Sequence, residues 1–116
     1  MKPLPPTLRE KRRYVLVKIT NCNPSDCNIT QKDLYYTIRD ACIELFGDVG
    51  LSNMHIAVVW SENQYFIVKC KRGSELQVIS SISIINQIHN TPVSMHTVKI
   101  SGTIHGTKKR IGMSHN

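Results

Sequence analysis

The sequence predicts an α+β sandwich in which four β-strands form one antiparallel sheet and two helices cover one face. Four segments alternate apolar and polar side chains, as half-buried strands do. Two segments between them repeat apolar residues at helical spacing. The resulting order, β-α-β-β-α-β, gives a single sheet because right-handed crossovers interleave its two βαβ units. This is the ferredoxin-like or RRM-like sandwich.

The first strand and the first helix have clear boundaries. The predicted strand from Tyr14 to Thr20 alternates cleanly and turns three residues inward: Val15, Val17 and Ile19. Thr30 is a good helix N-cap and has the acid Asp33 three residues later. The apolar residues that follow recur at helical spacing: Leu34, Ile38, Cys42 and Leu45. We expect Gly47 to stop this helix in the manner of a C′ glycine.

The second half of the chain repeats this pattern. Strands from Met54 to Trp60 and from Tyr65 to Lys71 are joined by the turn SENQ, and alternation turns Ile56, Val58 and Trp60 inward. The sequence SELQ, which begins at Ser74, matches a capping box before an apolar helix. The expected buried stripe of that helix is Leu76, Ile79, Ile82, Ile85 and Ile88. A last strand runs from Val93 to Ser101.

The 116 residues suffice for one compact domain with a modest core. We expect residues 1–12 to form a basic flexible arm, 13–104 to form the α/β domain, and 105–116 to form a basic tail. No signal peptide is visible, no apolar run is long enough to span a bilayer, and the four cysteines lack Cys-x-x-Cys spacing. These features predict a cytoplasmic protein with reduced thiols that does not interact with membranes.

Positive charge is the strongest functional signal. The net charge of +7 suggests a polyanionic partner, and ten of the 15 cations lie in three short stretches: Arg9, Lys11, Arg12 and Arg13; Lys69, Lys71 and Arg72; Lys108, Lys109 and Arg110. The first and third strands are expected to be antiparallel neighbours. The start of one would then lie beside the end of the other and gather Arg12, Arg13, Lys71 and Arg72 into an RNA-binding patch. The alternative is a solvated strand edge that opposes aggregation.

The outward face of the predicted sheet is apolar and poor in aromatic residues. It carries Tyr14, Leu16, Ala57, Val59, Tyr65 and Ile67. The third strand lacks the glycine-aromatic signature with which RRM domains stack bases. Apolar groups at the centre of a sheet are costly to leave wet, so we expect them to be covered. The cover is either the chain's own tail or a partner protein, and the short polar tail favours the partner.

No metal site or catalytic constellation is predicted. The five histidines are scattered without ligand spacing, and the carboxylates of the first helix are expected to form its solvated face: Asp40, Glu44 and Asp48. Cys42 and Cys70 face inward as small core residues. The alternative function is a ferredoxin-like domain that binds a small ligand between subunits, although the loop after the first strand lacks anion-binding glycines. A stand-alone nuclease would need clustered carboxylates, which the sequence lacks.

Four segments occur in an order and spacing that resemble the archaeal and eukaryotic ribonuclease P protein component 2 family. They are LPPTLREKRRYVLVKI, LFGDVGL, YFIVKCKRG and VKISGTI. The resemblance extends from about Leu4 to Ile104, nearly the whole chain. Its most specific parts are the opening PPTLREK with RRY and the closing SGTI, whereas NCNPSDCN matches no pattern of the family.

The resemblance implies a non-catalytic subunit of ribonuclease P, the ribonucleoprotein endonuclease that removes the 5′ leader of precursor tRNA. In this family the RNA component carries the active site and its Mg²⁺ ions, so the protein is expected to bind no cofactor. The implied partners are ribonuclease P RNA, precursor tRNA, protein component 3 and other protein subunits. The apolar outward face and the loop GDVGLSN then become candidates for partner contact and self-association.

Overall fold

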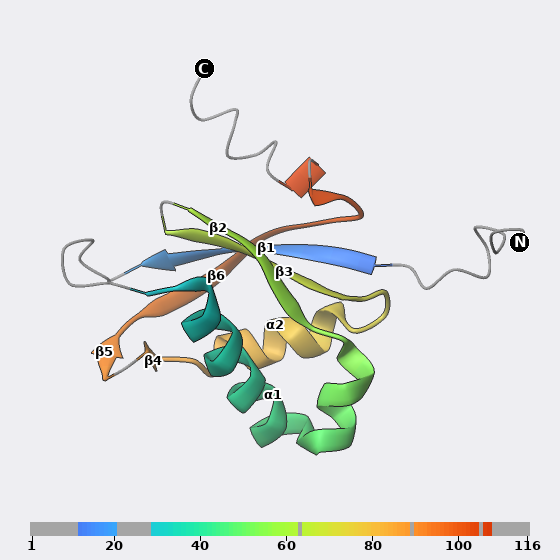
Figure 1. Ribbon diagram of the computed structural model, residues 1–116, viewed down its shortest axis with the longest axis horizontal. Coiled ribbons are helices and arrows are strands. Elements are labelled where there is room, and N and C mark those ends of the chain that lie inside the picture. The colour runs from blue at the N-terminus through green and yellow to red at the C-terminus, as the bar shows by residue number, and fades with distance from the viewer. Residues whose placement is uncertain (1–11, 21–28, 63, 89, 105, 108–116) are drawn as a thin grey trace, which may run out of the picture.

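The computed structural model describes residues 12–20, 29–62, 64–88, 90–104 and 106–107 (Figure 1). The sheet has the order β2-β3-β1-β6, with every neighbouring pair antiparallel, and α1 and α2 lie together on one side of it. This arrangement confirms the predicted fold class. The elements are β1 (Arg12–Thr20), α1 (Gln31–Met54), β2 (Ala57–Glu62), β3 (Tyr65–Lys71), α2 (Glu75–Ser83), β4 (Gln87–Ile88), β5 (Thr91–Pro92) and β6 (Ser94–Ser101).

α1 begins as the sequence predicts. The Thr30 hydroxyl accepts a hydrogen bond from the Asp33 backbone N–H, and the Asp33 carboxylate accepts one from the Thr30 N–H, each at 3.1 Å. Gly47, at φ 75°, interrupts the helix, but helical structure resumes and continues to Met54. α1 is therefore kinked where the sequence predicted a stop and a connection. His55, in the left-handed conformation, ends it. No helix among the described residues is long and apolar enough to cross a membrane.

α2 differs from the prediction in its cap, its end and its buried face. Ser74 makes no side-chain cap bond; the Glu75 carboxylate instead accepts a hydrogen bond from the Gly73 N–H. The helix ends at Ser83, so the expected stripe cannot continue to Ile88, which is buried on β4 instead. Leu76 is 77% exposed, and the buried residues are Val78, Ser81 and Ile82.

The main core fills the space between the sheet and the helices, and a β-bulge changes which side chains of β2 reach it. Pairing between β2 and β3 shifts from Val58 opposite Val68 to Trp60 opposite Ile67, so one strand has an extra residue. Trp60 therefore shares the outward face with Ile67, although strict alternation predicted it inward. A second bulge lies where β1 pairs with β6, between Leu16 and Val17.

Candidate nucleic-acid interface

Two central strands bring cations together at one end of the sheet. The register of β1 and β3 places Arg12 opposite Lys71 and Arg13 opposite Cys70, and Arg72 follows β3 in an exposed turn. We call Arg12, Arg13, Lys71 and Arg72 the cationic end. Its geometry agrees with the sequence prediction, because adjacent antiparallel strands place the start of one beside the end of the other. Its role in binding RNA stays a prediction.

The cationic end differs in its charge environment from Arg39 of α1. Within the described parts of the chain, an ion pair joins Arg39 to Asp40 at 3.1 Å, and none is found at the cationic end. Arg12, Lys71 and Arg72 are exposed, whereas Arg13 is partly buried. Cations that are solvated and not neutralised by a carboxylate can replace the counterions of a polyanion.

Arg13 and Lys69 extend this cationic surface in different directions. A Cβ built at Gly102 would lie 2.8 Å from Arg13 Nη1, so the Arg13 side chain reaches the segment that follows β6. Lys69 lies opposite Tyr14 and on the same outward face as Arg12 and Lys71. The other predicted RNA-binding cations lie outside the described residues: Arg9, Lys11, Lys108, Lys109 and Arg110.

The centre of the outward face is covered by the chain itself. Leu16 and Ile67 lie opposite each other in β1 and β3, and both are 0% exposed although neither belongs to the core under the helices. Lys99, which pairs opposite Leu16, donates from Nζ to the Gly106 carbonyl oxygen at 3.0 Å. Figure 1 shows the segment after β6, in red, on the side of the sheet away from α1 and α2. We call residues 102–104 and 106–107 the C-terminal turn.

Leu16 and Ile67 are therefore buried without a partner, where the sequence favoured a partner as their cover, and their contact with a partner stays a prediction. The C-terminal turn is polar, and its polar groups bond to one another. Thr107 is fully buried, and its hydroxyl donates to the Thr103 carbonyl oxygen at 2.7 Å. The Gly106 N–H donates to the Thr103 hydroxyl at 2.9 Å. The other residues predicted to contact a partner are partly exposed, and their role stays a prediction: Tyr14, Ala57, Val59 and Tyr65.

Tyr65 lies at the end of the outward face that is opposite the cationic end. Lys18 Nζ lies 5.8 Å from the centre of the Tyr65 ring, and the two residues pair across β1 and β3. Glu62 pairs with Tyr65 from the other side, on β2. This end therefore combines one tyrosine with charges of both signs, unlike the end that holds Tyr14.

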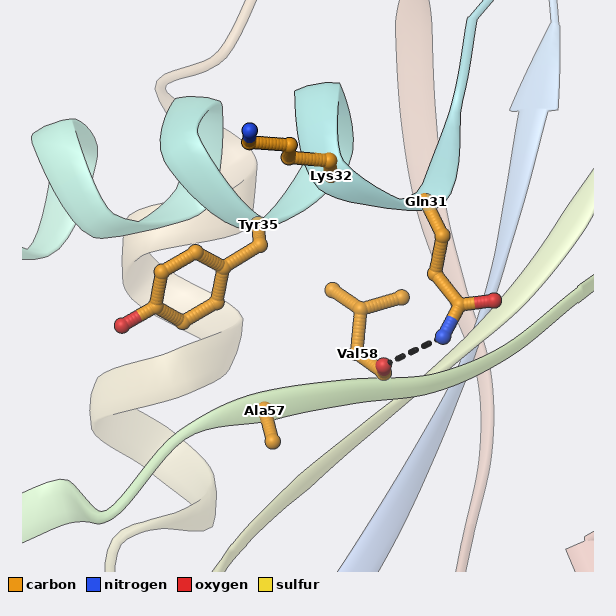
Figure 2. Close-up of a pocket in the computed structure, with 5 residues that line it drawn as sticks. All are labelled: Gln31, Lys32, Tyr35, Ala57 and Val58. Carbon is orange, nitrogen blue, oxygen red and sulfur yellow. Dashed lines mark hydrogen bonds between the residues drawn. The ribbon is translucent and has the colours of Figure 1, made fainter.

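A shallow depression lies between the start of α1 and β2 (Figure 2), lined by Gln31, Lys32, Tyr35, Ala57 and Val58. The Gln31 amide Nε2 donates to the Val58 carbonyl oxygen at 2.7 Å, so it is already engaged. Lys32 Nζ lies 5.8 Å from the centre of the Tyr36 ring, outside the depression's lining. The polar groups of a small-ligand site converge on a common point, whereas those of this depression do not.

The described thiols are not arranged for nucleophilic chemistry. Burial raises the pKa of Cys42, against a smaller opposing effect of a hydrogen bond with Ser81. Burial, with a smaller contribution from the negative charge of Glu75, raises the pKa of Cys70 to about 11. Both thiols are therefore protonated near neutral pH, whereas a nucleophilic cysteine needs a lowered pKa. Within the described residues, no group of three or more His, Cys, Asp and Glu side chains is placed to hold a metal ion.

The fold and the charge distribution define an RRM-like α+β protein with a cationic end on its central strands and an outward face whose centre is buried within the chain. The chain belongs to the Rpp14/Pop5 family, whose model matches residues 13–112. The resemblance seen in the sequence is thus confirmed over nearly the whole domain.

Curated relatives and a solved structure agree with this family. A protein of Methanocorpusculum labreanum named ribonuclease P protein component 2 is 45% identical over 112 residues, which cover 96% of this chain and 73% of the relative. A protein of the same name from Methanocaldococcus jannaschii is 33% identical, covering 93% of this chain and 78% of the relative. A chain in the cryo-EM structure of yeast ribonuclease MRP shares the fold, with a TM-score of 0.67, 12% identity and coverage of 92% and 90% of the two chains.

Proposed function

We propose that this chain is a non-catalytic protein subunit of ribonuclease P, the enzyme that removes the 5′ leader of precursor tRNA. The observation that carries the proposal is the identity of up to 45%, over nearly the whole chain, with proteins named ribonuclease P protein component 2. The subunit binds the RNA component in the cytoplasm and works with protein component 3 and the other protein subunits. Cleavage and its Mg²⁺ ions are assigned to the RNA.

The cationic end supports the RNA-binding part of this proposal. Arginine suits phosphate because its planar guanidinium can donate two parallel hydrogen bonds, and the cationic end has three arginines beside Lys71. These residues lie at one end of two neighbouring strands and in the turn that follows, so one stretch of RNA backbone can meet several of them together. Such contacts depend little on base identity, which suits a subunit that supports one structured RNA while many precursors are processed.

We expect the isolated protein to leave precursor tRNA uncut in Mg²⁺ buffer. An enzyme reconstituted from ribonuclease P RNA and the full set of protein subunits should cleave the leader, and omission of this chain should lower its rate, because the RNA then lacks a supporting subunit. The measurement is the single-turnover rate with and without this chain, with an unrelated protein of similar positive charge as control. Cleavage by RNA-free protein through several purification columns, or equal rates with and without the chain, would contradict the proposal.

A further inference from the structure

Tyr14 lies on the outward face within the cationic surface. Across β1 and β3 it pairs with Lys69, and across β1 and β6 it pairs with Ser101. The next outward pair toward the cationic end is Arg12 with Lys71. The tyrosine is partly exposed. An aromatic side chain is thus bordered by three cations of the two central strands, and by no carboxylate at these register positions.

The covered centre of the sheet limits this site on its other side. Two residues further along β1, Leu16 is fully buried, and its neighbour Lys99 is held by Gly106 of the C-terminal turn. The outward face therefore cannot act as the extended base platform of an RRM domain, which stacks two or three bases. It also offers no continuous apolar surface to a protein partner at its centre. Beyond the covered centre of this face, Tyr14 offers an aromatic contact that is flanked by positive charge.

We propose that Tyr14 stacks on one unpaired base of the RNA while Arg12, Lys69 and Lys71 bind the adjacent phosphates. This inference rests on the proposed function and goes beyond it, because the proposed function requires phosphate contacts alone. Stacking on an aromatic side chain accepts every base, since each has a π-face, and the flanking cations hold the backbone of the same nucleotides. The ligand is thus a single-stranded segment, such as a loop or bulge of the structured RNA, and not a duplex.

Tyr65 provides the matched control. It lies on the same face and on a central strand, and a lysine approaches its ring, but Glu62 is its other cross-strand neighbour. A polyanion therefore meets mixed charge at Tyr65 and positive charge at Tyr14. We expect the Tyr65 ring to contribute little to RNA affinity.

The test compares the binding of Tyr14→Leu, Tyr14→Phe and Tyr65→Leu to ribonuclease P RNA over a range of salt concentrations. Tyr14→Leu should weaken binding by roughly 5- to 150-fold, the effect of losing one stacked base. Its log-log salt slope should stay within about half a unit of the wild-type value, because no phosphate contact is removed. Tyr14→Phe keeps the ring and should bind like the wild type, as should Tyr65→Leu. If Tyr14→Leu does not fold, ultraviolet crosslinking of 4-thiouridine-labelled RNA to the wild-type protein gives a second readout, and the crosslinked peptide should contain Tyr14.

Wild-type affinity in folded Tyr14→Leu would overturn the stacking inference and leave Tyr14 as a candidate protein contact. An equal loss in Tyr14→Phe would also overturn it, because the ring would then not be the group that matters. In the crosslinking experiment, labelling at Tyr65 without labelling at Tyr14 would do the same. Failure of the proposed function looks different: the wild-type protein itself would then show no preference for ribonuclease P RNA.

Discussion

Leu16→Ala is expected to destabilise the free protein by about 2 to 5 kcal/mol, the usual cost of truncating a fully buried leucine. Leu16 is 0% exposed on the face of the sheet away from the helices, where Ile67 is also buried. Truncation would leave a cavity at this buried position. Thermal and urea unfolding of the isolated protein, with no RNA or protein partner present, measures the loss directly.

Leu76→Ala removes the same atoms from a leucine that is 77% exposed on α2, so it is the matched control. Apart from the difference in helix propensity between leucine and alanine, its free energy of unfolding should stay within about 0.5 kcal/mol of the wild-type value. Equal stability of the two variants would mean that the outward face is open in solution. The sequence-based expectation of a partner on Leu16 and Ile67 would then be restored.

A variant with alanine at all four residues of the cationic end is expected to bind ribonuclease P RNA more weakly and with a flatter salt dependence. If each side chain neutralises about one phosphate, the log-log slope of the binding constant against salt should fall by roughly 3 to 4 units. The reason is that each lost contact no longer releases counterions. The measurement is an equilibrium titration at several salt concentrations, with circular dichroism to verify the fold.

The control variant replaces Lys32 and Arg39, which lie on α1 on the helix-covered side of the sheet. Arg39 already pairs with Asp40, so this double variant should change the slope by less than about half a unit. An unchanged slope in the four-alanine variant, or an equal change per cation in the control, would show that the cationic end has no special contact with the RNA.

The cationic end could be predicted from the sequence because it depends on few assumptions. Strict alternation defines β1 and β3, and the crossover rule makes them antiparallel neighbours. The position of Arg12 beside Lys71 then follows from the strand boundaries alone. The cap of α1 was equally predictable, since Thr30 and Asp33 satisfy each other's backbone groups within one turn.

The burial of Leu16, the outward position of Trp60 and the early end of α2 depend on contacts between distant residues, which no local sequence pattern reports. Leu16 is buried beside Lys99, which bonds to Gly106 of a turn with internal bonds of its own, whereas the sequence of that turn indicates only a polar tail. The outward position of Trp60 depends on a bulge in the pairing with β3. The early end of α2 reflects competition between helical periodicity and the β4–β5 hairpin, in which Asn90 adopts the left-handed conformation.

We expect this chain to bind ribonuclease P RNA as a specific subunit and not through positive charge alone. The most direct measurement is a competition experiment at one fixed salt concentration near physiological, with labelled ribonuclease P RNA and an excess of an unrelated structured RNA of similar length. Unlabelled ribonuclease P RNA should displace the label at a concentration at least tenfold lower than the unrelated RNA does. Equal displacement by the two competitors would contradict this expectation, because the net charge of +7 would then suffice to explain the binding.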